Sequence, residues 1–125
     1  LDRRCQQRGI DFGCSTFCLD ALDAVDPYVK WHKVASIEAQ WDKFVRAVVA
    51  KGKPILISNG MSGGVDPAES IVGGHRYATL HCTTSYPAAI EDVNLRSIPT
   101  DRTWGWWGLS DHTTHPTIAP CAAVA

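Results

Sequence analysis

Short apolar segments alternate along this chain with longer polar or amphipathic segments. Five candidate strands begin near residues 10, 32, 54, 77 and 106, so their starts lie 22 to 29 residues apart. Strands that recur at this interval, with helix-sized segments between them, are typical of successive βα units in a parallel sheet. The five segments read IDFGCS, HKVAS, PILIS, YATLHCT and WWGLS.

The segments between the strands support helices to different degrees. The spacing predicts one helix from Ile37 to Ala50, because apolar residues recur there about every 3.6 positions and a glycine follows. Residues 84–103 contain two prolines and predict a long loop with at most one helical turn. Shorter helices are predicted over Cys18 to Val25, after Asp66-Pro67 and from Pro116 onward.

All five candidate strands end in polar groups, which bears on the architecture. An open doubly wound sheet binds its ligand at one switch point, whereas a closed (β/α)8 barrel gathers side chains from every strand end. The pattern therefore favours the barrel, and the chain has no glycine-rich nucleotide-binding motif. The strand ends are Ser15-Thr16, Ser36 with Glu38, Ser58-Asn59, Thr83-Thr84 and Ser110-Asp111-His112.

Composition narrows the class of protein further. The 125 residues carry a net charge of -1, which predicts neither nucleic acid nor a membrane surface as a partner. No apolar run is long enough for a membrane span, and no signal peptide opens the chain. Five cysteines without a C-x-x-C pair argue against a disulfide framework, so we expect a reducing, cytoplasmic location.

Lys33 is the most informative single residue. It lies within an apolar strand, where alternation places it on the opposite face from His32 and Val34. If that face is the inside of a barrel, the ammonium must pair with or bind an anion, because an unpaired buried charge is costly. If the strand lies at a surface, the side chain reaches water instead. The residues leave both interpretations open, although Ser36 and Glu38 at the strand end favour a site.

Other candidate residues also have structural interpretations. Ser110 and His112 share a face by alternation, so they form a possible site, yet a lone histidine is more often structural. Asn59-Gly60 suits either backbone donors around an anion or a tight turn. We expect the tryptophans at 104, 106 and 107 to pack between sheet and helices, and the cysteines to be small buried hydrophobes.

Five motifs in order resemble the sialic acid synthase family, the N-acetylneuraminate synthases and their relatives in spore coat polysaccharide biosynthesis. The resemblance runs from Gly9 to the C-terminus. It is carried by GIDFGCSTF, HKVASIE, KPILISNGM, LHCTTSYPAAIEDVNL and GLSDHT, which start at Gly9, His32, Lys53, Leu80 and Gly108.

The resemblance implies an α/β fold: part of a (β/α)8 TIM barrel, approximately strands three to seven, incomplete at both ends. The whole of 1–125 would be a fragment of a single barrel domain, without the family's C-terminal antifreeze-like domain. The implied reaction condenses phosphoenolpyruvate with N-acetylmannosamine or a related amino sugar and releases phosphate. The implied cofactor is Mn²⁺ or Mg²⁺, and the parent protein is expected to be a homodimer.

The same resemblance assigns roles to individual residues. Lys33 would bind the phosphate and carboxylate of phosphoenolpyruvate, and Glu38 would lie near the sugar or the attacking water. Tyr86 would bind sugar hydroxyls, Thr84 would face the substrate, and His112 would be one metal ligand. Hydroxyls for the same anion would come from Ser15, Ser36, Ser58 and Ser110.

The chain also departs from the family pattern. Cys14-Ser15-Thr16-Phe17 stands where S-T-P-F is usual, and Asn59 replaces the threonine of S-T-G-M. The second metal histidine belongs to a strand that lies outside this chain. Two alternatives follow: a non-catalytic truncated barrel, which on its own would show no synthase activity, or a related synthase that uses phosphoenolpyruvate and a sugar phosphate.

Overall fold

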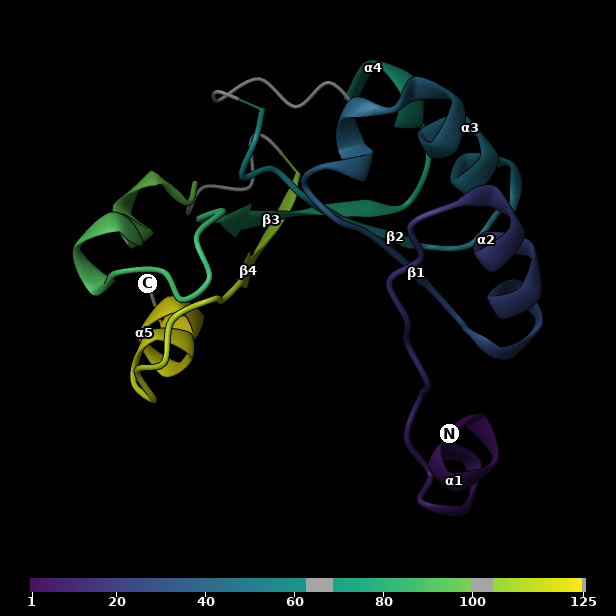
Figure 1. Cartoon of the computed structure of the whole chain (residues 1–125), viewed down its shortest axis with the longest axis horizontal. Coiled ribbons are helices and arrows are strands. Elements are labelled where there is room, and N and C mark those ends of the chain that lie inside the picture. Colours follow the sequence, from purple (N-terminus) through teal and green to yellow (C-terminus); the bar gives the residue numbers. More distant parts are fainter. Residues whose placement is uncertain (63–68, 100–104, 125) are drawn as a thin grey trace.

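The computed structural model describes residues 1–62, 69–99 and 105–124, and its centre is a parallel sheet. The strands are β1 (His32–Val34), β2 (Ile55–Ser58), β3 (Tyr77–Cys82) and β4 (Trp106–Ser110). They are hydrogen-bonded in the order β1-β2-β3-β4, so each strand lies beside the next one in the sequence (Figure 1). The predicted succession of parallel strands is confirmed for these four segments.

The first predicted strand, which begins near residue 10, is not a strand in the structure. Residues 10–15 reach β1 only through an isolated parallel bridge between Ser15 and Lys33. The ring of Trp31 gives the reason, because a side chain added at Gly13 would lie 2.1 Å from its Cη2 atom. The Trp31 ring therefore fills the space beside Gly13 and separates this segment from the ladder until Ser15.

Three helices cover one face of the sheet. They are α2 (Leu19–Val25), α3 (Asp42–Ala50) and α4 (Glu69–Val72). The core between helices and strands includes Phe44, Val45 and Val48 from α3, and Ile57 from β2. Burial of such side chains contributes roughly 1.5–3 kcal/mol each relative to exposure, so this layer holds the sheet in place.

The remaining helices lie around this layer. A helix α5 (Ile118–Val124) packs near β4, as the sequence predicts, and α1 (Asp2–Gln7), which the sequence pattern did not reveal, stands apart in Figure 1. The predicted loop over 84–103 contains two 3-10 turns, η3 (Ile90–Asp92) and η4 (Leu95–Ser97). The predicted start of a helix at Asp66-Pro67 lies outside the described residues. A further turn, η1 (Asp26–Tyr28), follows α2.

The helix predicted from Ile37 to Ala50 is divided. A 3-10 turn, η2 (Glu38–Gln40), precedes α3, and Trp41 between them is non-helical with ψ of 88°. Ala39 in η2 is buried in the core, but Ile37 is 67% exposed, so the large apolar side chain at the start of the predicted helix does not join the core-facing stripe. Without that burial a single long helix gains nothing from tertiary packing, and the chain turns at Trp41 instead.

Two expectations about packing are only partly right. Of the five cysteines, all unpaired, Cys82 is buried, whereas Cys18 and Cys121 are exposed. Trp107 is half-buried, but Trp106 is 61% exposed because it lies on the sheet face opposite α2, α3 and α4. Trp104 lies outside the described residues. Within the described part of the chain, no helix has the length and apolar character that crossing a membrane requires.

Candidate functional site

One face of the sheet, opposite the helices, carries most of the predicted site residues. Lys33 pairs in register with Leu56, and two residues along β2 lies Ser58. Ser110 pairs with Cys82 at the end of β3 and β4. Because side chains alternate along strands and paired residues point the same way, Lys33, Ser58 and Ser110 share this face. The isolated bridge with Lys33 places Ser15 beside them.

Lys33 is half-buried in the middle of β1. Its neighbours His32 and Val34, which are 1% and 0% exposed, point to the other face, as the alternation predicts. Among the residues that the structure describes, no acidic side chain forms an ion pair with Lys33. The charge of Lys33 is therefore not neutralised by the described residues, and it is available to an external anion.

Ser58 has a hydroxyl that is buried and unused. Its residue is 1% exposed, and Oγ has no hydrogen-bond partner within the described residues. A buried hydroxyl without a partner costs free energy, so such a group in a folded protein calls for an explanation such as a ligand. Ser58 is thus the strongest single indication of binding among the predicted hydroxyls.

Ser36 and Thr84 meet at the backbone of Gly60. The Gly60 amide donates a hydrogen bond to Ser36 Oγ at 3.1 Å, and Thr84 Oγ1 donates to the Gly60 carbonyl at 3.3 Å. The ends of β1, β2 and β3 are thereby joined through the two backbone groups of one residue, Gly60. The structure brings these two predicted residues together, but through a glycine rather than by direct contact.

His112 is held from several sides. Its Nδ1 lies 2.7 Å from the carbonyl of Thr83 and must donate, because a carbonyl oxygen can only accept. The Tyr86 ring stacks on the imidazole with centroids 4.1 Å apart, and Cys82 Sγ lies 3.8 Å from Nδ1. This tautomer leaves the Nε2 lone pair to accept, as in metal-binding histidines, and Cys82 Sγ lies 3.9 Å from that nitrogen.

The described residues supply one suitable metal ligand, His112, and not a complete metal site. In the described ranges, no group of three or more histidine, cysteine, aspartate or glutamate side chains could hold a metal ion. His112 Nε2 is the suitable donor, and further ligands would have to come from elsewhere. Glu38, which opens η2 and is half-buried, makes no hydrogen bond or ion pair with the described residues.

A second polar cluster lies at the other end of β1 and was not predicted. His32 Nε2 lies 3.0 Å from Asp26 Oδ1, and Lys53 Nζ lies 2.9 Å from the same oxygen. Lys53 also donates to the Asp26 carbonyl. The hydrogen bond from Lys53 holds the pKa of the Asp26 carboxyl below its ordinary value, and His32 acts the same way, against the opposing effect of partial burial.

His81 was missed as well. Its Nε2 donates to the Val93 carbonyl at 2.6 Å, and Ser97 Oγ lies 3.3 Å from Nδ1, so this ring fixes the η3–η4 segment to β3. The sequence contained no signal for it, because the partners are backbone and side-chain groups of an irregular loop.

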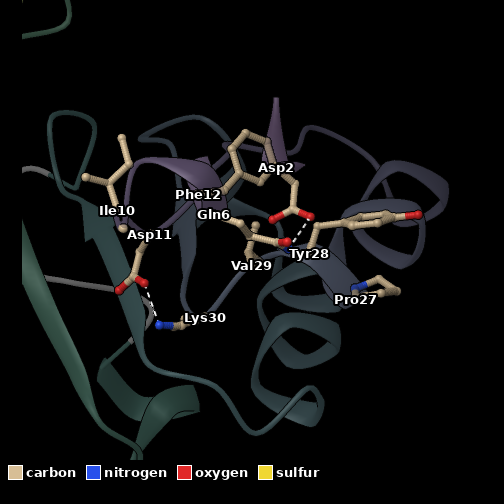
Figure 2. A pocket seen from close by; sticks show the side chains of 10 residues that line it. Asp2, Gln6, Ile10, Asp11, Phe12, Pro27, Tyr28, Val29 and Lys30 are labelled. Atoms are coloured by element: carbon tan, nitrogen blue, oxygen red, sulfur yellow. Dashed lines mark hydrogen bonds and ion pairs between the residues drawn. The ribbon is translucent and has the colours of Figure 1, made fainter. Parts of the chain in front are cut away.

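A pocket of about 480 Å³ lies away from these residues (Figure 2). Its lining comes from α1, the segment after it and the connection into β1, including Gln6, Tyr28 and Val29. An ion pair of 2.6 Å joins Lys30 and Asp11 at this pocket. None of the predicted site residues lines it, so the pocket and the candidate site are separate features.

Taken together, these elements define a parallel α/β protein whose strand ends carry a lysine, several hydroxyls and an oriented histidine. The model of the NeuB family matches residues 1–125, and the chain belongs to this family. The recognition of sialic acid synthases and their spore coat relatives from the five motifs is thereby confirmed.

Individual relatives agree with this assignment. The chain is 32% identical to the spore coat polysaccharide biosynthesis protein SpsE of Bacillus subtilis, over 96% of this chain and 35% of SpsE. It is 33% identical to a pseudaminic acid synthase of Campylobacter jejuni, over 86% of this chain and 32% of that protein. The chain therefore spans about a third of the length of these two relatives.

A solved structure supports the fold. The N-acetylneuraminic acid (sialic acid) synthetase of Leptospira borgpetersenii, in complex with citrate, superposes with a TM-score of 0.89 at 26% identity. The match covers 97% of this chain and 45% of that one. The α/β fold of this chain is thus similar to the corresponding part of a sialic acid synthetase.

Proposed function

We propose that this chain supplies the phosphoenolpyruvate-binding strand ends of a NeuB-family synthase. The reaction condenses phosphoenolpyruvate with N-acetylmannosamine or a related N-acylated amino sugar and releases phosphate. The observation that carries the proposal is Lys33, a half-buried cation without an acidic partner in the described residues, beside the buried free hydroxyl of Ser58. A phosphorylated carboxylate offers both groups the acceptors that they lack.

Each residue then has a role that follows from its chemistry. Lys33 neutralises the phosphate and carboxylate, and preorganised hydroxyls on neighbouring strand ends orient the same anion. Glu38 lies near the sugar or the attacking water in this proposal, and the exposed Tyr86 ring contacts sugar hydroxyls. The anion-binding hydroxyls are those of Ser15, Ser36, Ser58 and Ser110.

His112 would hold a divalent metal, Mn²⁺ or Mg²⁺, through Nε2, with the remaining ligands from outside the described residues. When bound, such an ion acts as a Lewis acid on the sugar aldehyde. The chain's own contribution is the orientation of the imidazole, since the Thr83 carbonyl fixes its tautomer and Tyr86 restricts its rotation.

The proposal includes the architecture. Four parallel strands in sequential order are the arrangement expected of consecutive units of a (β/α)8 barrel, in which active sites lie at the carboxyl ends of the strands. The hydroxyl-bearing ends of β1, β2 and β4 agree with this. A cytoplasmic location suits a chain whose five cysteines are all unpaired.

The test is phosphate release by the synthase that contains this chain, with the sugar as the variable. We expect release with N-acetylmannosamine and Mn²⁺ and none when the sugar is omitted. Equal turnover with arabinose 5-phosphate or erythrose 4-phosphate would instead assign the protein to the related sugar-phosphate synthases.

A second candidate concerns the 125 residues by themselves. The described part contains one suitable metal donor, His112, and no group of three. We therefore propose that the isolated chain binds anions without turnover. Synthase activity of the purified 125-residue chain that is abolished by His112→Ala would contradict this second proposal while supporting the first.

A further inference from the structure

Gly60 lies in a space that admits no side chain. A Cβ atom at this position would lie 2.7 Å from the Cys82 carbonyl oxygen, 2.9 Å from Thr84 Cγ2 and 3.1 Å from Ser36 Oγ. The first of these neighbours is backbone and cannot move away cheaply. Gly60 is therefore glycine because the ends of β1 and β3 close on it from both sides.

The hydrogen bonds around Gly60 use the two hydroxyls in opposite ways. A hydroxyl has one hydrogen to donate and two lone pairs that accept. Ser36 accepts from the Gly60 amide, so its own hydrogen remains for another acceptor. Thr84 donates its hydrogen to the Gly60 carbonyl, so it has none left for an anion.

This difference matters because an anion can only accept hydrogen bonds. Ser36 can donate to a phosphate or carboxylate without disturbing Gly60, and the buried Ser58 hydroxyl, two residues before Gly60, is also unused. Thr84 could donate to a ligand only by releasing the Gly60 carbonyl. The expectation that Thr84 binds substrate is thus less suitable than a role toward the loop after β2.

We propose that Thr84 is a positioning residue: the hydroxyl of Ser36 holds the backbone amide of Gly60, the hydroxyl of Thr84 holds its carbonyl, and together they keep Ser58 and Ser36 in place as the anion donors. The proposal rests on the proposed function for the identity of the anion. The fixing of Gly60 itself does not depend on it, since the two hydrogen bonds are present without a ligand.

The first experiment measures amide hydrogen exchange of Gly60 by NMR in the full 125-residue chain without ligand. Thr84→Val keeps the shape of the side chain and removes the donor, while Thr84→Ser keeps the donor. The Gly60 amide itself donates to Ser36, so Thr84 protects it only by keeping this backbone segment closed. We expect the Gly60 amide to exchange about fivefold faster in Thr84→Val, because opening becomes easier by one net hydrogen bond, and to return to its original rate in Thr84→Ser. Thr114→Val, the same change at an exposed loop residue, should leave Gly60 unaffected. Unchanged Gly60 exchange in Thr84→Val would overturn the proposal.

The second experiment titrates the same variants with phosphoenolpyruvate. We expect Ser36→Ala to weaken binding about tenfold, Thr84→Val about fivefold, and Thr84→Ser hardly at all. If Thr84→Val abolishes binding while Gly60 exchange stays normal, Thr84 contacts the anion directly and the positioning role is wrong. If phosphoenolpyruvate fails to bind the unmodified chain but Gly60 responds as expected, the positioning role stands and the proposed function of this chain is contradicted.

Discussion

Two lysines near β1, Lys53 just before β2 and Lys33 within β1 itself, differ in what surrounds them. Lys53, at the end where β1 begins, meets the Asp26 carboxylate at 2.9 Å, and the same carboxylate meets His32. Lys33, further along β1, has hydroxyl-bearing strand ends as neighbours and no acidic partner in the described part of the chain. Lys53 thus has an acidic partner within the protein, whereas Lys33 has none among the described residues, and the proposed function gives it an external anion.

This comparison distinguishes a polar cluster whose charge the protein itself balances from a charged group that the described residues leave without a partner. In the cluster of Asp26, His32 and Lys53 the lysine charge is balanced by the Asp26 carboxylate, although the buried Nδ1 atom of His32 has no hydrogen-bond partner in the described residues. Lys33, whose neighbouring hydroxyls still have hydrogens to donate, gains a partner only when an anion binds. The proposed function therefore rests on the charge balance around these polar groups more than on their burial.

Replacing each of the two lysines by methionine should have the largest effects, and the two variants should differ in which property they change. We expect Lys33→Met to weaken phosphoenolpyruvate binding about 10- to 100-fold, because a hydrogen bond to a charged group is worth about 1.5–3 kcal/mol. Lys53→Met should leave the affinity nearly unchanged and lower the free energy of unfolding instead. Calorimetric titration and urea unfolding of both variants measure the two effects. Equal losses of affinity would show that the two lysines do not differ in function.

The alternation of apolar and polar residues was sufficient to predict the four strands of the sheet and the face on which Lys33 lies. It correctly placed Lys33 opposite His32 and Val34, and it found four of the strands. It was wrong for residues 10–15, where the Trp31 ring packs against the backbone of Gly13, a contact between residues far apart in the sequence that no local pattern records.

The polar clusters were harder to predict for the same reason. Lys53 reaches Asp26 across 27 positions, and Thr84 reaches Gly60 across 24. These pairings exist only once the strands are in register and the loops have closed. Sequence motifs could mark Ser36, Ser58 and Thr84 as polar residues at strand ends. They could not show which of these hydroxyls already donates its hydrogen to another group of the protein.

The contribution of Asp26 to stability should depend on pH, and Asp26→Asn tests this for the cluster around Lys53. The pKa of Asp26 is lowered in the folded state by the hydrogen bond from Lys53, below its ordinary value of 3.8. A lowered carboxyl pKa stabilises the fold above the unfolded pKa, and this stabilisation is lost as the pH falls through the folded pKa. We expect the variant to be less stable by about 1 kcal/mol near neutral pH, since Asp26 is partly exposed.

The measurement is urea unfolding of both proteins from neutral pH down to below the folded pKa of Asp26. The difference between them should persist above about pH 4 and shrink below it as Asp26 is protonated. Asp23→Asn is the matched control, because Asp23 pairs with Lys51 at a site where its own side chain is 71% exposed. A difference that stays constant at low pH would mean that the Asp26 charge is not what stabilises this end of the sheet.

Replacement of Tyr86 should have the smallest effect on stability. It tests whether the Tyr86 ring orients the imidazole of His112. Tyr86 is 76% exposed, and its ring stacks on His112, which also donates to the Thr83 carbonyl. We expect Tyr86→Ala to lower the free energy of unfolding by only about 0.5 kcal/mol, the lower range for an aromatic pair. The imidazole should nevertheless become more mobile, because the Thr83 hydrogen bond fixes one ring nitrogen but does not prevent rocking about it. NMR signals of the His112 ring should therefore shift and broaden in Tyr86→Ala and remain nearly native in Tyr86→Phe, which keeps the stacked ring. Native His112 signals in Tyr86→Ala would show that the Thr83 carbonyl and Cys82 suffice to orient the histidine, and that Tyr86 is free to serve the sugar alone.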